Sequence, residues 1–366
     1  MNYNILFSII ILCFPWIAQA QFTDTPIEIS PNTPTVANLF DPNDTFDPIL
    51  TKDILNTATY LHLNEKQLEE LVAQRPQSIV LTLPQNNGQT IKLALHQRQI
   101  LTPDFTVRTA DSKVPFDYQP GLYYRGEVIG QHKSVAAISI FPDYVMGVLA
   151  FAGDNYVLGH LQPDVYPAGS DYVLYKEADL LLTNPFACES LPVPHHPTDA
   201  LRLEPEELKS NNAANSIKVY IEADHDLFKK KGSTASGATN YVTGFFNVVA
   251  ALYAAENIPI EISEIYVWTS SDPYPSISSS AAMTAFRSRV ANNFNGDIAH
   301  LVAIDAANNG GIAYVDVLCS KSYGVAYSDV GNTFNNNTVP TYSWTTSVFT
   351  HEMGHNLGSP HTQSCG

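Results

Sequence analysis

Three histidines, a glutamate and a glycine near the end of the chain have the spacing of a zinc site. They are His351, Glu352, His355, Gly358 and His361, an H-E-x-x-H sequence extended by x-x-G-x-x-H. On a helix, His351 and His355 project from one face because they are four residues apart. Gly358 can adopt the left-handed backbone conformation that ends a helix, so the chain can turn and bring His361 back. The spacing therefore predicts three nitrogen ligands for one metal ion.

A zinc ion held by three protein side chains keeps a fourth position for water, which is the arrangement of catalytic zinc sites. Glu352 directly follows the first of these ligands, so its carboxylate is expected to accept a proton from that water. A polar helix end with solvated histidines is the alternative, but it does not explain the positions of Glu352 and Gly358. We therefore expect His351, His355 and His361 to bind one zinc ion, with Glu352 as the general base.

The extended motif resembles that of the metzincin zinc endopeptidases. Upstream, Gly310-Gly311-Ile312-Ala313-Tyr314-Val315 and then Leu318-Cys319-Ser320 are similar to the adamalysin (reprolysin) branch, and the resemblance runs from about Ile217 to the end of the chain. It implies a zinc metalloendopeptidase that hydrolyses peptide bonds. In that branch, the strand similar to Gly311-Ile312-Ala313 pairs with an extended substrate, so these three residues are expected to bind peptide by β-augmentation.

The sequence departs from the pattern of this branch in two ways. Thr362 follows the third histidine, where animal adamalysins usually have aspartate. No methionine follows Met353, so the Met-turn of the family is missing and we expect a fragment whose C-terminal subdomain is truncated. The resemblance also implies that Cys319 and Cys365 form disulfides. Whether they pair with each other or with cysteines further downstream stays open.

Composition and the N-terminal residues limit the location and the partners of the protein. The chain has 36 acidic and 19 basic residues, which argues against nucleic acid or an anionic membrane as a partner. Residues 1–20 are expected to be a secretory signal, because the apolar run Ile5–Ile17 precedes Ala18-Gln19-Ala20, a small-x-small cleavage site. An uncleaved anchor is the alternative, since no Lys or Arg precedes the run. No later segment is long and apolar enough to cross a membrane, so we expect a secreted, extracellular protein.

Residues 21–187 are expected to form a separate, mainly β domain. Short apolar or alternating runs separated by turn residues predict antiparallel hairpins, and a helix is expected near Glu65–Ala73. The runs are Tyr123–Val128, Ser134–Ile140, Val145–Leu149 and Tyr156–Leu158. This segment resembles the propeptide that precedes adamalysin-type catalytic domains. The resemblance implies a zymogen in which the propeptide is an intramolecular partner.

Residues 188–215 are predicted to be an exposed connector, because prolines and charged residues interrupt the strand pattern. Maturation cleavage is expected in such a segment, and a plain interdomain linker is the alternative. Cys188 begins the connector, and its thiolate could take the fourth zinc position and keep the enzyme latent, as the cysteine switch of related families does. A disulfide or a buried free thiol are the alternatives, because removal of the signal leaves three cysteines.

Residues 216–366 are expected to be an α+β, zincin-like catalytic domain with a twisted, mixed five-stranded sheet and an active-site helix. Runs of apolar residues at period 2 or 3.6 place its elements. The expected strands are Ile217–Ala223, Ile260–Trp268, Ile298–Ile304, Gly311–Val317 and Tyr323–Val330, and the expected helices are Ser236–Glu256, Ser279–Phe294 and Trp344–Leu357. This order agrees with the upper subdomain of the metzincins.

Several other histidines and aspartates have side chains that can bind metals. His195, His196, His225 and His300 have no partner at ligand spacing and are expected to be core or surface residues. Calcium binding by Asp224, Asp226 and Asp297 stays an open alternative. Lys218, however, lies near the position where the family has its calcium-binding carboxylate. Two rival functions remain: a secreted peptide-binding or adhesion protein with a metzincin-like fold, and a zinc hydrolase for a non-peptide bond. The retained Glu352 argues against the first rival.

Overall fold

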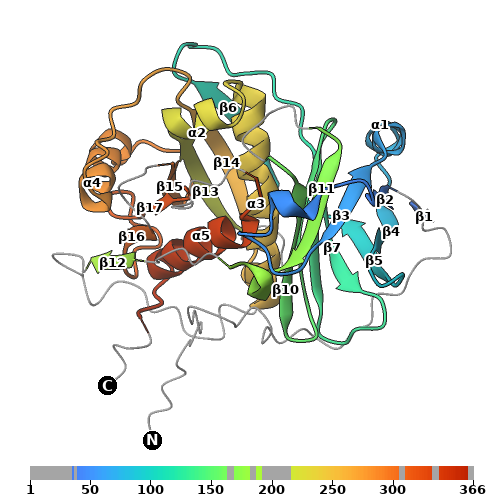
Figure 1. The fold of residues 1–366 in the computed structure, drawn as a ribbon. Coiled ribbons are helices and arrows are strands. Elements are labelled where there is room, and N and C mark those ends of the chain that lie inside the picture. Colours follow the sequence, from blue (N-terminus) through green and yellow to red (C-terminus); the bar gives the residue numbers. More distant parts are fainter. Residues whose placement is uncertain are drawn as a thin grey trace, which may run out of the picture.

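The computed structural model describes residues 35–36, 39–162, 169–181, 187–191, 216–304, 310–331 and 338–361. In this part of the chain the strands form two sheets, one of ten strands and one of seven, which lie on either side of a long central helix (Figure 1). The residues predicted to be the signal sequence lie outside the described ranges. Among the described helices, none has the length and apolar character needed to cross a membrane.

The ten-stranded sheet is formed entirely by residues before the connector. Its order is β1-β4-β5-β7-β8-β9-β10-β11-β3-β2, and all neighbours are antiparallel except β1 and β4. The strands are β1 (Thr35–Val36), β2 (Phe40–Pro42), β3 (Thr59–Leu63), β4 (Ser78–Pro84), β5 (Thr90–Gln97), β7 (Leu122–Val128), β8 (Val135–Ile140), β9 (Val145–Phe151), β10 (Asp154–His160) and β11 (Asp171–Lys176). Four of them, β7 to β10, occur where the sequence predicts hairpins. Helix α1 (Glu65–Gln74) and the short 3-10 helices η2 (Pro48–Leu50) and η3 (Glu177–Asp179) complete this region.

The second sheet has seven strands rather than the expected five. Its order is β12-β16-β17-β15-β13-β14-β6, in which only β16 and β17 are antiparallel. The strands are β6 (Leu101–Thr109), β12 (Ala187–Leu191), β13 (Ile217–Ala223), β14 (Ile260–Val267), β15 (Ile298–Ala303), β16 (Gly310–Tyr314) and β17 (Val325–Asp329). The five central strands come from residues after 216, as expected. The expected count of five was wrong because β6, which precedes the connector, and β12, which includes the first four residues of the expected connector, add a strand at each edge.

Helices cover both faces of the seven-stranded sheet. Alternate residues of β13 point to opposite faces, so Val219 and Ile221 join one core and Tyr220 joins the other. Helices α3 (Ala235–Ala255) and α5 (Tyr342–Asn356) pack on the first face, and α4 (Ser279–Val290) packs on the second. The short helix α2 (His225–Lys230) precedes α3.

Helix α3 is buried nearly all round. Its N-cap is Thr234, whose side chain accepts a hydrogen bond from the backbone N–H of Gly237. Apolar residues occupy every face of α3, as expected for a helix that has no solvent-facing side. It contacts β7, β8 and β9 on one side and β13, β14 and α5 on the other. The central helix therefore joins the two sheets into one continuous hydrophobic core.

Candidate metal centre

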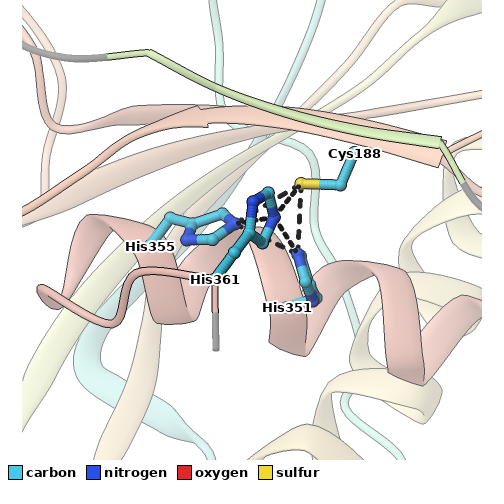
Figure 2. Close-up of side chains that lie close together, drawn as sticks. All are labelled: Cys188, His351, His355 and His361. Carbon is cyan, nitrogen blue, oxygen red and sulfur yellow. Dashed lines mark hydrogen bonds between the residues drawn. The ribbon is translucent and has the colours of Figure 1, made fainter. Parts of the chain in front are cut away.

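Helix α5 presents two of the three expected ligands. His351 and His355 lie one turn apart on α5, and their Nε2 atoms are 3.0 Å from each other. His361 follows the end of the helix, and its Nε2 lies 3.3 Å from that of His351 and 3.1 Å from that of His355 (Figure 2). The structure thus brings together the three histidines that the spacing predicts to be ligands of one ion.

The turn after α5 depends on a glycine in the left-handed region. Gly358 has a φ of 98°, a conformation that side chains rarely adopt. Its N–H donates to the carbonyl of His355, and the N–H of Ser359 donates to the carbonyl of Gly354. These bonds satisfy carbonyls at the end of the helix and reverse the chain toward the site. The local turn therefore positions His361.

Asn356, which the sequence did not single out, anchors the end of the metal-binding helix. Its side-chain Nδ2 donates to the carbonyl of Tyr314 at 2.9 Å and to that of Val325 at 3.1 Å. The backbone carbonyl of Asn356 accepts hydrogen bonds from the backbone N–H groups of Val317 and Leu318. The only signal in the sequence was an asparagine inside the motif, because its complete burial and its partners on the neighbouring strands are visible only in the structure.

The imidazole nitrogens that converge are suited to bind a cation. The Nδ1 of His355 lies 2.6 Å from the carbonyl of Ser359, an acceptor, so Nδ1 carries the proton and Nε2 keeps its lone pair. Burial lowers the pKa of His351 to about 3, with smaller contributions from His355 and His361. Burial also lowers the pKa of His355. Neutral lone pairs that face one another at about 3 Å repel unless a cation lies between them.

The thiol of Cys188 completes the cluster. Its Sγ lies 3.1 Å from the Nε2 of His351, 3.1 Å from that of His361 and 3.4 Å from that of His355 (Figure 2). A zinc ion at the usual bond lengths would hold its nitrogen ligands roughly 3.4 Å apart and place a sulfur ligand roughly 3.6 Å from them. The observed contacts are shorter than these edges by about 0.1 to 0.5 Å, so the four side chains need to separate only slightly to admit the ion. One sulfur and three imidazoles are also a donor set that zinc prefers.

Glu352 lies beside this cluster and is completely buried. Burial raises the pKa of Glu352 well above its usual value, and the nearby Cys188 thiol opposes this rise. The carboxylate of Glu352 lies next to the four side chains of the cluster but is not a member of the cluster.

The expected peptide-binding residues lie on β16, directly beside the segment that carries Cys188. Strand β12 pairs with β16 in parallel, with Cys188 opposite Gly311 and the next two residues of β12 opposite Ile312 and Ala313. The backbone edge expected to hold a substrate is thus occupied by the chain itself. Figure 2 shows β12 running along this edge, with the Cys188 side chain directed at the three histidines.

The other candidate metal ligands do not gather into a second site. His300 is buried, stacks on Phe349 with 3.9 Å between ring centroids and bonds to Ser328, while His225 bonds to the carbonyl of Trp268. Asp224 caps α2, Asp226 pairs with Lys229, and Asp297 accepts from the N–H of Lys218. Within the described ranges these carboxylates form no cluster of three or more ligands, so calcium gains no support. His195 and His196 lie outside those ranges.

Within the described part of the chain, neither Cys188 nor Cys319 forms a disulfide. Cys319 is exposed. Cys365 and Cys13 lie outside the described residues, so the structure does not test the bridge between Cys319 and Cys365. Of the three alternatives for Cys188, its position beside the histidines agrees with a role at the metal centre.

Comparison with known proteins agrees with this geometry. Residues 213–365 match the model of the family Reprolysin_5, metallo-peptidase family M12. Among solved structures, the chain is similar to the crystal structure of metalloproteinase-II from Bacteroides fragilis, with 13% sequence identity, 90% of this chain and 89% of that chain covered, and a TM-score of 0.41. The family match and the His–Glu motif that lies within it support a metzincin-like metalloprotease over residues 213–365.

Proposed function

We propose that the protein is a secreted zinc metalloendopeptidase that is made as a latent zymogen. The observation that supports this proposal best is the convergence of three Nε2 atoms and one Sγ atom within 4.8 Å of one another, beside a buried glutamate. His351, His355 and His361 would hold the ion in the active enzyme. Zinc bound there supplies a Lewis acid that activates water and polarises the scissile carbonyl.

Glu352 would serve as the general base. Its carboxylate accepts a proton from the attacking water and returns it to the leaving amine. Burial raises the pKa of Glu352, which makes its carboxylate a stronger base toward the water and favours retention of the proton until it is passed to the amine. An ordinary exposed glutamate would release the proton to solvent sooner. The dry surroundings of Glu352 therefore support a role in proton transfer.

Strand β16 would bind the substrate through its backbone. Its partner on one side is β17, and its other edge is taken by β12. Once β12 leaves, the edge of β16 becomes free for an extended peptide, which would add a strand beside the zinc. Gly311, Ile312 and Ala313 are the residues of β16 expected to face that peptide, because their partners in β12 occupy the same edge.

Latency would result from the same segment. The Cys188 thiolate would take the position that water needs on the metal, and β12 would cover the peptide-binding edge. One short strand thus blocks both the reacting centre and the substrate. The signal-like residues 1–20 support secretion, and the acidic composition argues against nucleic acid as a partner.

Two measurements on the whole protein test this proposal. The purified chain should contain one zinc per molecule, and after maturation it should cleave members of a peptide library only without chelator. Glu352→Ala should keep the zinc but lower kcat by about a thousandfold or more, since it removes the general base. Glu256→Ala, an exposed acid at the end of α3, is the matched control and should leave kcat unchanged.

Each outcome distinguishes this proposal from its rivals. Zinc binding with peptide capture but no cleavage would instead identify a binding or adhesion protein. Cleavage of a non-peptide bond alone would identify a different zinc hydrolase. Absence of stoichiometric zinc, or full activity in Glu352→Ala, would overturn the assignment of the site.

A further inference from the structure

The region before the connector contributes an integral strand to the seven-stranded sheet. Strand β6 pairs in parallel with β14 from Ile262 opposite Leu101 to Val267 opposite Thr109, with one irregularity in the register. The N–H of Ile262 also donates to the carbonyl of Ile100 at 2.8 Å. Without β6, the edge of β14 would have unpaired backbone groups, which favour association with other chains. Strand β6 is therefore an integral part of the seven-stranded sheet.

The ten-stranded sheet packs on α3 at very short range. A Cβ atom built on Gly244 would lie 2.2 Å from the Sδ of Met146, so a larger residue at this point of α3 would have to displace the Met146 side chain. The hydroxyl of Ser139 donates to the carbonyl of Gly244 at 3.1 Å. Phe245 and Phe246 on the same helix are fully buried. The contact has the close packing of a protein interior rather than that of a transient interface.

Buried polar groups also connect the two parts. Asn247 of α3 is fully buried, and its Nδ2 donates to the carbonyls of Tyr124 and Ile138, each at 3.2 Å. Its Oδ1 accepts from the Nε of Arg125 at 2.9 Å, and the same guanidinium donates to the carbonyl of Ala250 at 3.1 Å. Separation of the two parts would leave these groups without partners unless water replaced them. The network therefore favours the joined state.

The same sheet supports the entry to the metal-binding helix. The hydroxyl of Tyr175 donates to the carbonyl of Pro340 at 2.6 Å, two residues before α5 begins. A Cβ on Gly159 would lie 2.6 Å from the ring of Tyr342, the first residue of α5. The N–H of Gln162 donates to the carbonyl of Thr338. The helix that carries His351 and His355 thus begins on a surface formed by the N-terminal region.

We propose that this N-terminal body, residues 39–162 and 169–181, is a permanent subunit of the enzyme that stays bound after the connector is cut. Its removal would expose α3, an apolar helix with no solvent-facing side, together with the edge of β14. Large apolar interfaces of this kind are typical of obligate complexes. The mature protein would therefore consist of two non-covalently joined chains. This inference does not depend on zinc binding or on peptidase activity.

The test cuts the full-length chain between its two parts. A recognition site for a specific protease is placed within residues 198–209, and the cut protein is passed through a sizing column at a series of dilutions. We expect both pieces to elute together at the volume of the uncut protein down to about 10 nM, and to separate only in denaturant. Hydrogen exchange in α3 and β14 should be as slow after the cut as before it. Separate peaks in native buffer, or faster exchange in these elements, would overturn the proposal.

A matched pair of variants tests which contacts hold the two pieces together. Arg125→Ala removes two hydrogen bonds to α3, so the cut pieces should separate at a lower urea concentration than those of the wild type. Lys66→Ala removes a charge from the exposed face of α1 and should leave the midpoint unchanged. Equal midpoints for the two variants would show that the Arg125 contacts do not hold the interface.

Discussion

Gly311 is expected to position Glu352, and the structure shows how close the two residues are. The φ of Gly311 is not in the left-handed region, so its backbone would accept alanine without strain. The side chain of Glu352, however, leaves no space for the added methyl group. A Cβ at this position would lie 2.4 Å from the Cγ of Glu352 and 2.6 Å from its Cδ and Oε1, whereas ordinary contacts begin at 3.4 Å. In Gly311→Ala the glutamate or the strand must therefore move by about 1 Å to remove the overlap.

A displacement of this size is enough to impair catalysis. Misplacement of a reacting group by about 1 Å can lower a rate roughly a hundredfold, which corresponds to about 2.7 kcal/mol in the activation barrier. We therefore expect kcat of matured Gly311→Ala to fall by about two orders of magnitude. KM should change little, because a peptide would bind the backbone of β16. Zinc content should stay the same, since the metal-binding cluster consists of other residues.

The assay measures kcat, KM and zinc content of the matured protein with one peptide substrate. Ile265→Val is the control, because it shortens a fully buried core side chain on β14, four strands away from β16. Such a substitution typically costs 0.5–1.5 kcal/mol of stability and should not affect turnover. An unchanged kcat in Gly311→Ala would refute the reasoning, because Glu352 would then tolerate the displacement. A parallel loss of zinc would show that the effect is on the metal centre instead.

Three further predictions concern latency and acid stability. Cys188→Ser should raise the residual activity of the uncut protein without reaching that of the matured enzyme, because a serine hydroxyl is a much weaker zinc ligand than a thiolate while β12 still covers the peptide-binding edge; a residual activity equal to that of the wild type, measured with the same peptide, would argue against the switch. If the N-terminal body stays bound, one cut within residues 192–215 leaves Cys188 tethered to that body at an effective concentration of about 1 mM. Latency should therefore persist until a second cut within residues 182–186 releases Cys188. Full activity after the first cut alone would contradict this. Burial lowers the pKa of His160 from 6.5 to about 4, so the unfolded state binds the proton more tightly than the folded state. About 3 kcal/mol of folding stability should therefore be lost as the pH falls from about 6.5 to about 4. His160→Asn should reduce that loss in urea unfolding at these two pH values, and an unchanged pH dependence would show that His160 does not cause it.

Local features of the site could be predicted from the sequence because they depend on residues close together in the chain. The four-residue spacing of His351 and His355 determines that they share a helix face, and Gly358 allows the turn that follows. Helix α3 was expected at Ser236–Glu256 and occurs at Ala235–Ala255. The apolar periodicity of such segments is sufficient to place an element to within a few residues.

Some boundaries were wrong where contacts with other elements decide them. The strand expected at Gly311–Val317 is β16, which ends at Tyr314. The chain turns at Asp316, whose φ is 58° and whose N–H donates to the carbonyl of His355 at the end of α5. The helix expected to extend to Phe294 ends at Val290, after which Asn292 adopts a φ of 61°. These endings depend on local backbone geometry and distant partners that apolar periodicity does not report.

The sequence by itself determined which residues can bind the metal, which faces of the helices and strands are apolar, and which chemistry the motif can perform. Only the tertiary structure decided that Cys188 meets His351, 163 residues away, and that β6 and β12 flank a sheet formed by residues after 216. The physical reason is that strand periodicity shows which side of a strand is buried but not which strand pairs with it. Pairing depends on backbone groups common to every residue and on the packing of the whole core.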